Sequence, residues 1–110
     1  MKKPTIVTLC GSTRFKDEFA KQQLNETLNG KIVLTIGCNL RDDNELFKNL
    51  LPEELRKLKA ILDVLHFRKI MISDEILVLN VNNYIGESTE REIEFANSIG
   101  VKIRYLLNEI

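Results

Sequence analysis

One glutamate in the segment Tyr84–Gly100 lies where a carboxylate could do chemistry. An α-helix turns by about 100° per residue, which centres the apolar residues of this segment on Glu92. These apolar residues are Ile93, Phe95, Ala96 and Ile99. Glu90 and Glu94 fall on the opposite side of the same helix, where solvent would surround them. A carboxylate that projects from an apolar face is how a glycosidic nucleophile would be placed, because its neighbours keep it poorly hydrated.

A purely structural role for Glu92 is the alternative. The stretch Thr89–Glu92 has the spacing of a capping box, in which the glutamate accepts a hydrogen bond from the backbone N–H of the threonine. Such a contact would stabilise the helix by about 1 kcal/mol and needs no substrate. Under that hypothesis the chain is a small α/β interaction protein.

A second candidate site follows the first apolar run, in the stretch Cys10–Phe15 (CGSTRF). A glycine, two hydroxyl residues and an arginine at the beginning of a helix suit an anion, because backbone N–H groups and hydroxyls can donate to its oxygens. Arg14 in the first helical turn opposes the helix dipole, and a bound phosphate would reverse that effect. The alternative is that Ser12 or Thr13 caps the helix while Arg14 points into water.

The elements that must position these residues alternate between strands and helices. Four apolar, β-branched runs predict strands at Thr5–Cys10, Lys31–Ile36, Glu75–Val81 and Lys102–Leu107. Helices are predicted at about Arg14–Leu28 before Gly30, from about Pro52 onward, and at about Thr89–Ile99 before Gly100. The second helix carries an apolar stripe for packing on the sheet, formed by Leu55, Leu58, Leu62 and Leu65.

This alternation predicts an α/β fold, a Rossmann- or flavodoxin-like three-layer sandwich with a parallel sheet of four to five strands. Right-handed crossovers favour the strand order 2-1-3-4, in which the winding reverses between strands 1 and 3. Ligands in such sheets bind at the carboxyl ends of the strands beside that reversal. The loops Gly11–Arg14 and Asn82–Ser88 border it, so the two candidate sites converge.

One connection in the chain is unusually long. The stretch Cys38–Leu51 has no clear periodicity, and a connection of this length in a compact domain is often a lid or a mobile segment. A disordered surface loop is the alternative.

The composition is that of one soluble domain, residues 1–110, and it excludes several classes of function. Sixteen Lys and Arg residues balance 16 Asp and Glu residues, which gives no general attraction to a nucleic acid polymer or an anionic membrane. No apolar run reaches the roughly 18 residues of a membrane-spanning helix, and the first residues do not form a secretory signal. Cys10 and Cys38 fit thiols in a reducing cytoplasm. With one His and no paired-cysteine spacing, neither a metal site nor a cofactor is expected.

Three motifs resemble those of the nucleoside 2-deoxyribosyltransferases and their relatives, the 2′-deoxynucleoside 5′-monophosphate N-glycosidases. Cys10–Arg14 is similar to the CGSxR phosphate loop of the monophosphate N-glycosidases. Ile70–Val81 (IMISDEILVLNV) looks like the family's passage from a helix into strand 3. Arg91–Ala96, followed by Gly100–Ile103, resembles the family's nucleophile helix and the strand after it. The resemblance covers most of the chain and implies a single nucleoside 2-deoxyribosyltransferase-like domain with a Rossmann-like fold.

Carried over residue by residue, the resemblance implies a role for each matched position. Glu92 matches the family's nucleophile, which attacks C1′ of the sugar and forms a glycosyl ester that water or a second base resolves. The 5′-phosphate of a (deoxy)nucleoside monophosphate would be held by Gly11, Ser12, Thr13, Arg14 and Ser88. Family sites are often completed by a neighbouring subunit, which implies a homodimer or a higher homo-oligomer.

The sequence departs from the family at positions that serve its chemistry. The family has an aspartate eight residues before Asp74, where this chain has His66, and a catalytic role and a packing role for His66 both remain open. After strand 3 this chain offers Asn80 and Asn82 in place of an aspartate; their amides can hydrogen-bond a base but cannot protonate it. Tyr84 either stacks on a base or covers the edge of the core. The sequence therefore predicts N-glycosidic bond hydrolysis or transfer on a nucleoside monophosphate, with a nucleotide-binding module of little or no activity as the alternative.

Overall fold

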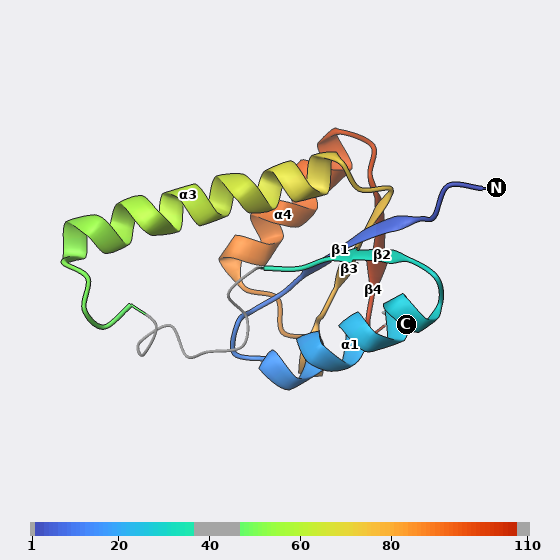
Figure 1. Cartoon of the computed structure of the whole chain (residues 1–110), viewed down its shortest axis with the longest axis horizontal. Helices are drawn as coiled ribbons and strands as arrows, with labels where there is room; N and C mark the ends of the chain where they lie inside the picture. The colour runs from blue at the N-terminus through green and yellow to red at the C-terminus, as the bar shows by residue number, and fades with distance from the viewer. Residues whose placement is uncertain (1, 37–46, 108–110) are drawn as a thin grey trace.

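The computed structural model describes residues 2–36 and 47–107, and their strands form one parallel sheet (Figure 1). The strands are β1 (Ile6–Cys10), β2 (Ile32–Leu34), β3 (Glu75–Val78) and β4 (Lys102–Tyr105). Their order is β2-β1-β3-β4 and every neighbouring pair is parallel, so the predicted α/β fold and strand order are confirmed. Each strand is shorter than predicted, because the apolar runs continue into the loops that surround the core.

Helices cover both faces of the sheet, which gives the three layers that the strand–helix alternation predicts (Figure 1). α1 (Lys16–Leu28) packs on one face, and α3 (Pro52–Met71) and α4 (Glu87–Ser98) lie together on the other. Successive side chains of a strand point to opposite faces of the sheet, so the core has two halves. One half contains Val7, Leu9, Phe19, Leu77 and Leu79, and the other contains Cys10, Ile70, Ile76, Val78 and Ala96.

Individual residues explain where the helices begin and end. Gly30 and Gly100, predicted as stops, have φ angles of +82° and +79°, a left-handed conformation that glycine adopts without strain. Pro52 begins α3 as predicted, at a position where its missing N–H costs nothing. Glu54 accepts a hydrogen bond from the backbone N–H of Leu51 at 3.0 Å, which satisfies one donor at this end of the helix.

Two helices begin at other residues than predicted. α1 begins at Lys16 rather than at about Arg14, and α4 begins at Glu87 rather than at Thr89. Both shifts concern candidate site residues. Arg14 precedes α1 and is not part of its first turn, whereas Glu92 lies in the second turn of α4.

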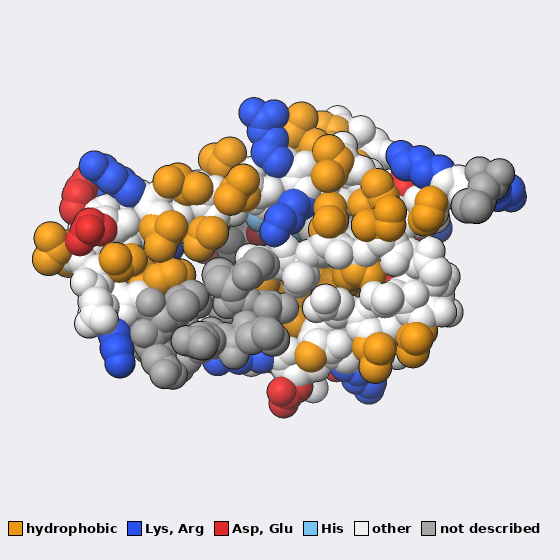
Figure 2. Space-filling view, viewed as in Figure 1, with side chains coloured by type: hydrophobic (Ala, Val, Ile, Leu, Met, Phe, Trp, Pro, Cys, Tyr) orange, Lys and Arg blue, Asp and Glu red, His pale blue; other side chains and the backbone are white. Residues whose placement is uncertain are grey.

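α3 extends beyond the edge of the sheet, and its apolar residues do not all pack on the core (Figure 1). Its C-terminal part packs on the sheet through residues such as Ile70. The prediction that the stripe of Leu55, Leu58, Leu62 and Leu65 packs on the sheet is wrong: none of the four belongs to either half of the core, Leu62 lines the pocket described below, and Leu65 is 50% exposed. Ile61 and Val64 are exposed as well, and Figure 2 shows hydrophobic side chains gathered along this helix.

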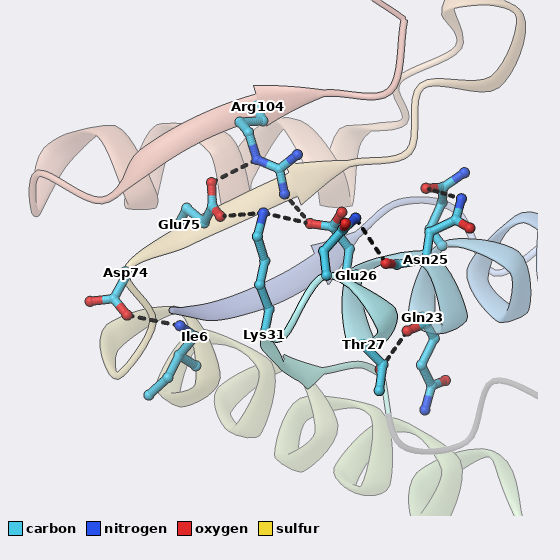
Figure 3. Close-up of polar contacts among 11 residues, drawn as sticks. Ile6, Gln23, Asn25, Glu26, Thr27, Lys31, Asp74, Glu75 and Arg104 are labelled. Carbon is cyan, nitrogen blue, oxygen red and sulfur yellow. Dashed lines mark hydrogen bonds and ion pairs between the residues drawn. The ribbon is translucent and has the colours of Figure 1, made fainter. Parts of the chain in front are cut away.

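Four charged side chains gather on the face of the sheet that α1 covers (Figure 3). Glu75 Oε1 lies 3.1 Å from Lys31 Nζ, and Glu75 Oε2 lies 2.6 Å from Arg104 Nε. Glu26 from α1 pairs with the same two cations, at 3.2 Å from Lys31 Nζ and in direct contact with Arg104 Nη2. Two carboxylates and two cations therefore compensate one another and tie α1 to β3 and β4.

Most of the stretch Cys38–Leu51, predicted as a lid or mobile segment, lies outside the described residues, and so does Cys38. Among the helices of the described ranges, none has both the length and the apolar character needed to cross a membrane.

Candidate functional site

An open pocket of about 420 Å³ lies at the carboxyl ends of β1 and β3. It is lined by the loop after β1, by one side of α3, and by the loop and first turns of α4. This is the place that the reversal in strand order predicts for a ligand. Its size falls within the usual range of small-molecule sites, about 300–1,000 Å³. The structure therefore brings the two candidate loops of the sequence to one cavity.

Glu92 faces this pocket from the second turn of α4, and its side chain is 15% exposed. The capping-box interpretation is wrong, because Gly86 is the N-cap residue and Thr89 is a buried residue within the helix. Glu92 is then the sixth helical residue, too far along α4 to bond back to the N-cap. Glu90 and Glu94 are exposed, as the helical periodicity predicts. The carboxylate of Glu92 is thus directed at a cavity and does not cap the helix that carries it.

His66 and Cys10 contact one another beside the carboxylate of Glu92. His66 Nε2 lies 3.4 Å from Glu92 Oε1 and 3.4 Å from Cys10 Sγ. Burial, followed by the negative charge of Glu92 and a hydrogen bond to it, raises the pKa of the Cys10 thiol well above its usual value. Cys10 is therefore a protonated thiol, a buried neutral neighbour of the carboxylate.

The surroundings of His66 indicate which of its nitrogens carries the proton. Nε2 faces the carboxylate of Glu92, which accepts hydrogen bonds. Nδ1 is buried and has no hydrogen-bond partner among the described residues. A proton on Nδ1 would leave a buried donor unsatisfied, so we assign the neutral tautomer that is protonated on Nε2. The N–H group of Nε2 then lies beside Cys10 Sγ and Glu92 Oε1, each at 3.4 Å.

The loop after β1 reaches the pocket through Gly11, Ser12 and Thr13. Gly11 allows the loop after β1 to approach Leu79 closely, because a Cβ atom at position 11 would lie only 3.2 Å from the Cβ of Leu79. Ser12 Oγ accepts a hydrogen bond from the backbone N–H of Arg14 at 3.3 Å. The alternative that Ser12 or Thr13 caps α1 is wrong, because the N-cap residue is Phe15 and no side chain caps it.

Arg14 does not line the pocket itself, but it contacts one of the residues that do, Tyr84. Its guanidinium carbon is 4.4 Å from the centre of the Tyr84 ring, and Nη2 is 3.4 Å from the Tyr84 hydroxyl oxygen. A cation stacked in this way on an aromatic ring is held by the ring's negative face. Arg14 thus joins the two loops at the rim, and Tyr84 presents its ring to Arg14 as well as to the pocket.

Ser88 lines the pocket within the first turn of α4, together with Gly86, Glu87 and Thr89. Within the described ranges no side chain caps this helix end, so its first backbone N–H groups are available to an anion. Glu87 carries a negative charge at the same place and opposes such binding. An anion here needs a nearby cation to offset that charge.

The two asparagines after β3 are not brought to the pocket lining. Asn80 is buried and bonds the backbone of Leu107 twice, with Oδ1 accepting from N–H and Nδ2 donating to C=O, both at 2.9 Å. Asn82 is exposed and has a φ angle of 53° in the short helical turn Val81–Asn83. Asn80 thus fastens the chain after β4 to β3, and Asn82 forms a turn.

Lys59 and Asp63 line the pocket but are not predicted as site residues from the sequence. They precede His66 by seven and three residues, which places all three on one side of α3. Counting back from His66 at helical spacing is the signal that could have found them. Lys59 brings a cation to the pocket and Asp63 a second carboxyl group.

The fold and the pocket define a parallel α/β protein with a ligand-sized cavity at the switch point of its sheet. The chain matches no protein-family model, and comparison with curated proteins and with solved structures gave no match either.

Proposed function

We propose that the protein hydrolyses or transfers the N-glycosidic bond of a (deoxy)nucleoside 5′-monophosphate, with Glu92 as the nucleophile. The observation that carries this proposal is the carboxylate of Glu92, which faces a pocket of about 420 Å³ and is oriented by His66 Nε2 at 3.4 Å. A partly buried carboxylate that does not cap its helix and faces a cavity is suited to attack on a sugar carbon.

The polar groups of the pocket fit the other parts of such a substrate. Hydroxyl groups of Ser12, Thr13 and Ser88 and the N-terminus of α4 offer donors to phosphate oxygens. Lys59 supplies the positive charge that Arg14, stacked on Tyr84, does not bring to the pocket. The phosphate would lie between these donors, with the sugar directed at Glu92.

The chemical step follows that of a retaining glycosidase. A carboxylate oxygen of Glu92 forms a bond to C1′, the C1′–N bond breaks, and its electron pair leaves with the base, which takes up a proton. In hydrolysis, water then attacks C1′ and loses a proton to solvent, the ester bond to Glu92 breaks, and the sugar phosphate leaves. In transfer, a second base attacks C1′ instead and loses its proton, which gives a new nucleoside monophosphate; both routes restore the carboxylate. The imidazole of His66 lies 3.4 Å from the carboxylate of Glu92, so we assign the proton for the leaving base to a water molecule in the pocket.

The direct test is to incubate the protein with a panel of ribo- and deoxyribonucleoside 5′-monophosphates and to measure free base by chromatography. We expect base release from the wild type, none from Glu92→Gln, and unchanged release from Glu94→Gln, whose side chain is exposed on the same helix. Calorimetry should show that Glu92→Gln still binds the nucleotide. Release that is unchanged in Glu92→Gln would reject the nucleophilic role.

A nucleotide-binding module with little or no catalysis is the second candidate. It is favoured by Asn80, which is bonded to the backbone of Leu107, does not line the pocket, and carries an amide that cannot protonate a leaving base. Under this hypothesis the wild type binds a nucleoside monophosphate in calorimetry and releases no base. The same panel of nucleotides therefore separates the two candidates.

A homodimer formed by the exposed side of α3 belongs to the same proposal. Ile61, Val64 and Leu65 are exposed on that side, opposite the residues of α3 that line the pocket. If two copies of α3 pack antiparallel with Ile61 on the two-fold axis, Glu54 of one copy lies beside Arg68 of the other, since both are seven residues from Ile61. The apolar centre and the opposite charges make this surface complementary to itself.

A further inference from the structure

We infer that Cys10, His66 and Glu92 form a binding site for a thiophilic divalent cation of the Zn²⁺ type. The inference goes beyond the proposed function and stands without it. No metal site is expected from the sequence, because its one His and two Cys residues do not have the spacing of metal ligands along the chain. The fold instead brings together three ligand types from β1, α3 and α4, and their ligand atoms all lie within 4.8 Å of one another.

Two of the three distances between the ligand atoms fit a tetrahedral ion, and the third is within 4.8 Å. With Zn–S near 2.3 Å and Zn–N or Zn–O near 2.0–2.1 Å, two ligand atoms of a tetrahedron are separated by about 3.3–3.6 Å. The observed separations are 3.4 Å from Cys10 Sγ to His66 Nε2 and 3.4 Å from His66 Nε2 to Glu92 Oε1. An ion could therefore bind with small rotations of side chains and without movement of the backbone.

The surroundings of the three residues leave one coordination position of the ion open to the pocket. Cys10 is fully buried beneath the pocket, whereas His66 and Glu92 line the pocket itself. An ion held by the three would thus have its fourth position directed at the cavity, the arrangement of an accessible zinc site with three protein ligands. A molecule in the pocket, or water, would complete the coordination.

Binding of the ion requires a defined change in protonation. The Cys10 thiol gives its proton to solvent and becomes a thiolate ligand. The proton of His66 moves from Nε2 to Nδ1, which is buried without a partner among the described residues. Because that second hydrogen bond is missing, we expect an affinity about 10–100-fold lower than in a site with a complete second shell. Metal bound here occupies the carboxylate of Glu92, so it would inhibit any chemistry that Glu92 performs.

The test is a titration of the metal-free, reduced protein with Co²⁺, which reports tetrahedral geometry and thiolate ligation in its absorption spectrum. We expect one equivalent of Co²⁺ to give the visible bands of a tetrahedral ion and a near-ultraviolet thiolate band, and Zn²⁺ to bleach both. Cys10→Ser should lose the thiolate band, and Glu92→Gln should weaken binding at least tenfold. Cys38→Ser, the matched control at the second cysteine, should keep the complete spectrum.

Several outcomes would overturn the inference. A wild type that binds no stoichiometric Co²⁺, a thiolate band that persists in Cys10→Ser, or a band that disappears in Cys38→Ser each excludes this site. Circular dichroism of the metal-free variants checks their folding; if Cys10→Ser does not fold, the wild-type spectrum and the Cys38→Ser spectrum still decide. Base release is not measured in this experiment, so failure of the proposed function leaves its outcome unaffected.

Discussion

The Nε2 atom of His66 lies 3.4 Å from the Oε1 atom of Glu92, so α3 orients the carboxylate that α4 carries. One residue further along α3, the ring of Phe67 packs edge-to-face on Phe95 of α4, with ring centres 4.9 Å apart. Such an aromatic pair fixes the distance between the two helices. The contact between His66 and Glu92 is therefore supported by a packed aromatic pair beside it.

We predict that His66 positions Glu92 and does not itself exchange a proton with substrate. His66→Ala should lower kcat for base release by about 10²-fold, as expected when a catalytic group is misplaced by about 1 Å, with little change in KM. His66→Gln should recover most of that loss, because its amide N–H can still donate to the carboxylate. Steady-state kinetics with the best monophosphate of the panel measures both. A Gln variant as slow as the Ala variant would contradict a positioning role.

We predict that Lys59, and not Arg14, determines the affinity for the phosphate group. Lys59→Gln removes a cation that lines the pocket and should weaken nucleotide binding about tenfold, or about 1.4 kcal/mol. Arg14→Gln removes a cation that is stacked on Tyr84 outside the lining and should change affinity little. Calorimetry with a nucleoside monophosphate measures the effect.

The matched nucleoside and a second lysine serve as controls for this prediction. Lys59→Gln should not affect binding of the nucleoside without phosphate, and Lys57→Gln, an exposed position on the same helix, should behave as the wild type. A large loss of phosphate affinity in Arg14→Gln would instead support the anion site that the sequence alone indicates.

The fold and the orientation of Glu92 could be predicted because both depend on local patterns. The β-branched runs and the glycines Gly30 and Gly100 mark the elements, and the handedness of crossovers limits their order. The direction of Glu92 follows from the helical period alone, which does not change when α4 begins two residues earlier. These features need no knowledge of distant contacts.

The contacts of Cys10 with His66 and of Arg14 with Tyr84 could not be predicted, because each joins residues that are distant along the chain. Cys10 and His66 are 56 residues apart, and Arg14 and Tyr84 are 70 residues apart. Their contacts depend on how far α3 extends beyond the sheet and on the path of two loops. No periodicity in the sequence encodes the extension of α3 or the path of these loops. The cation–π contact and the Cys–His–Glu cluster therefore become visible only in the structure.

We predict that Glu75 stabilises the fold at neutral pH and loses this effect in acid. Burial alone would raise its pKa, but hydrogen bonds from Lys31 and Arg104 outweigh burial and lower the pKa from its usual value of 4.5. The stabilisation is therefore complete above about pH 4.5 and is lost as the pH falls through the lowered pKa. Glu75→Gln should cost about 2 kcal/mol at pH 7, the typical size for hydrogen bonds to a charged group.

Urea denaturation of the wild type and Glu75→Gln at pH 7 and in acid measures this effect. The difference in free energy of unfolding should narrow as the pH falls, because protonation of Glu75 makes the wild type resemble the variant. Glu94→Gln, at an exposed position, is the control and should change stability at neither pH. If the difference in free energy of unfolding between wild type and Glu75→Gln is the same at both pH values, Glu75 stabilises the fold through packing and not through its charge.

We predict that a charge at Ile61 separates the dimer without disturbing the fold. Ile61 is 57% exposed, so Ile61→Lys should leave the monomer stable, but it places two like charges together on the proposed two-fold axis. Sedimentation should then show a dimer for the wild type and a monomer for Ile61→Lys. Leu28→Lys, at a position of α1 that is 75% exposed, is the control and should remain dimeric. If the wild type sediments as a monomer, or Ile61→Lys as a dimer, the exposed side of α3 does not join two copies.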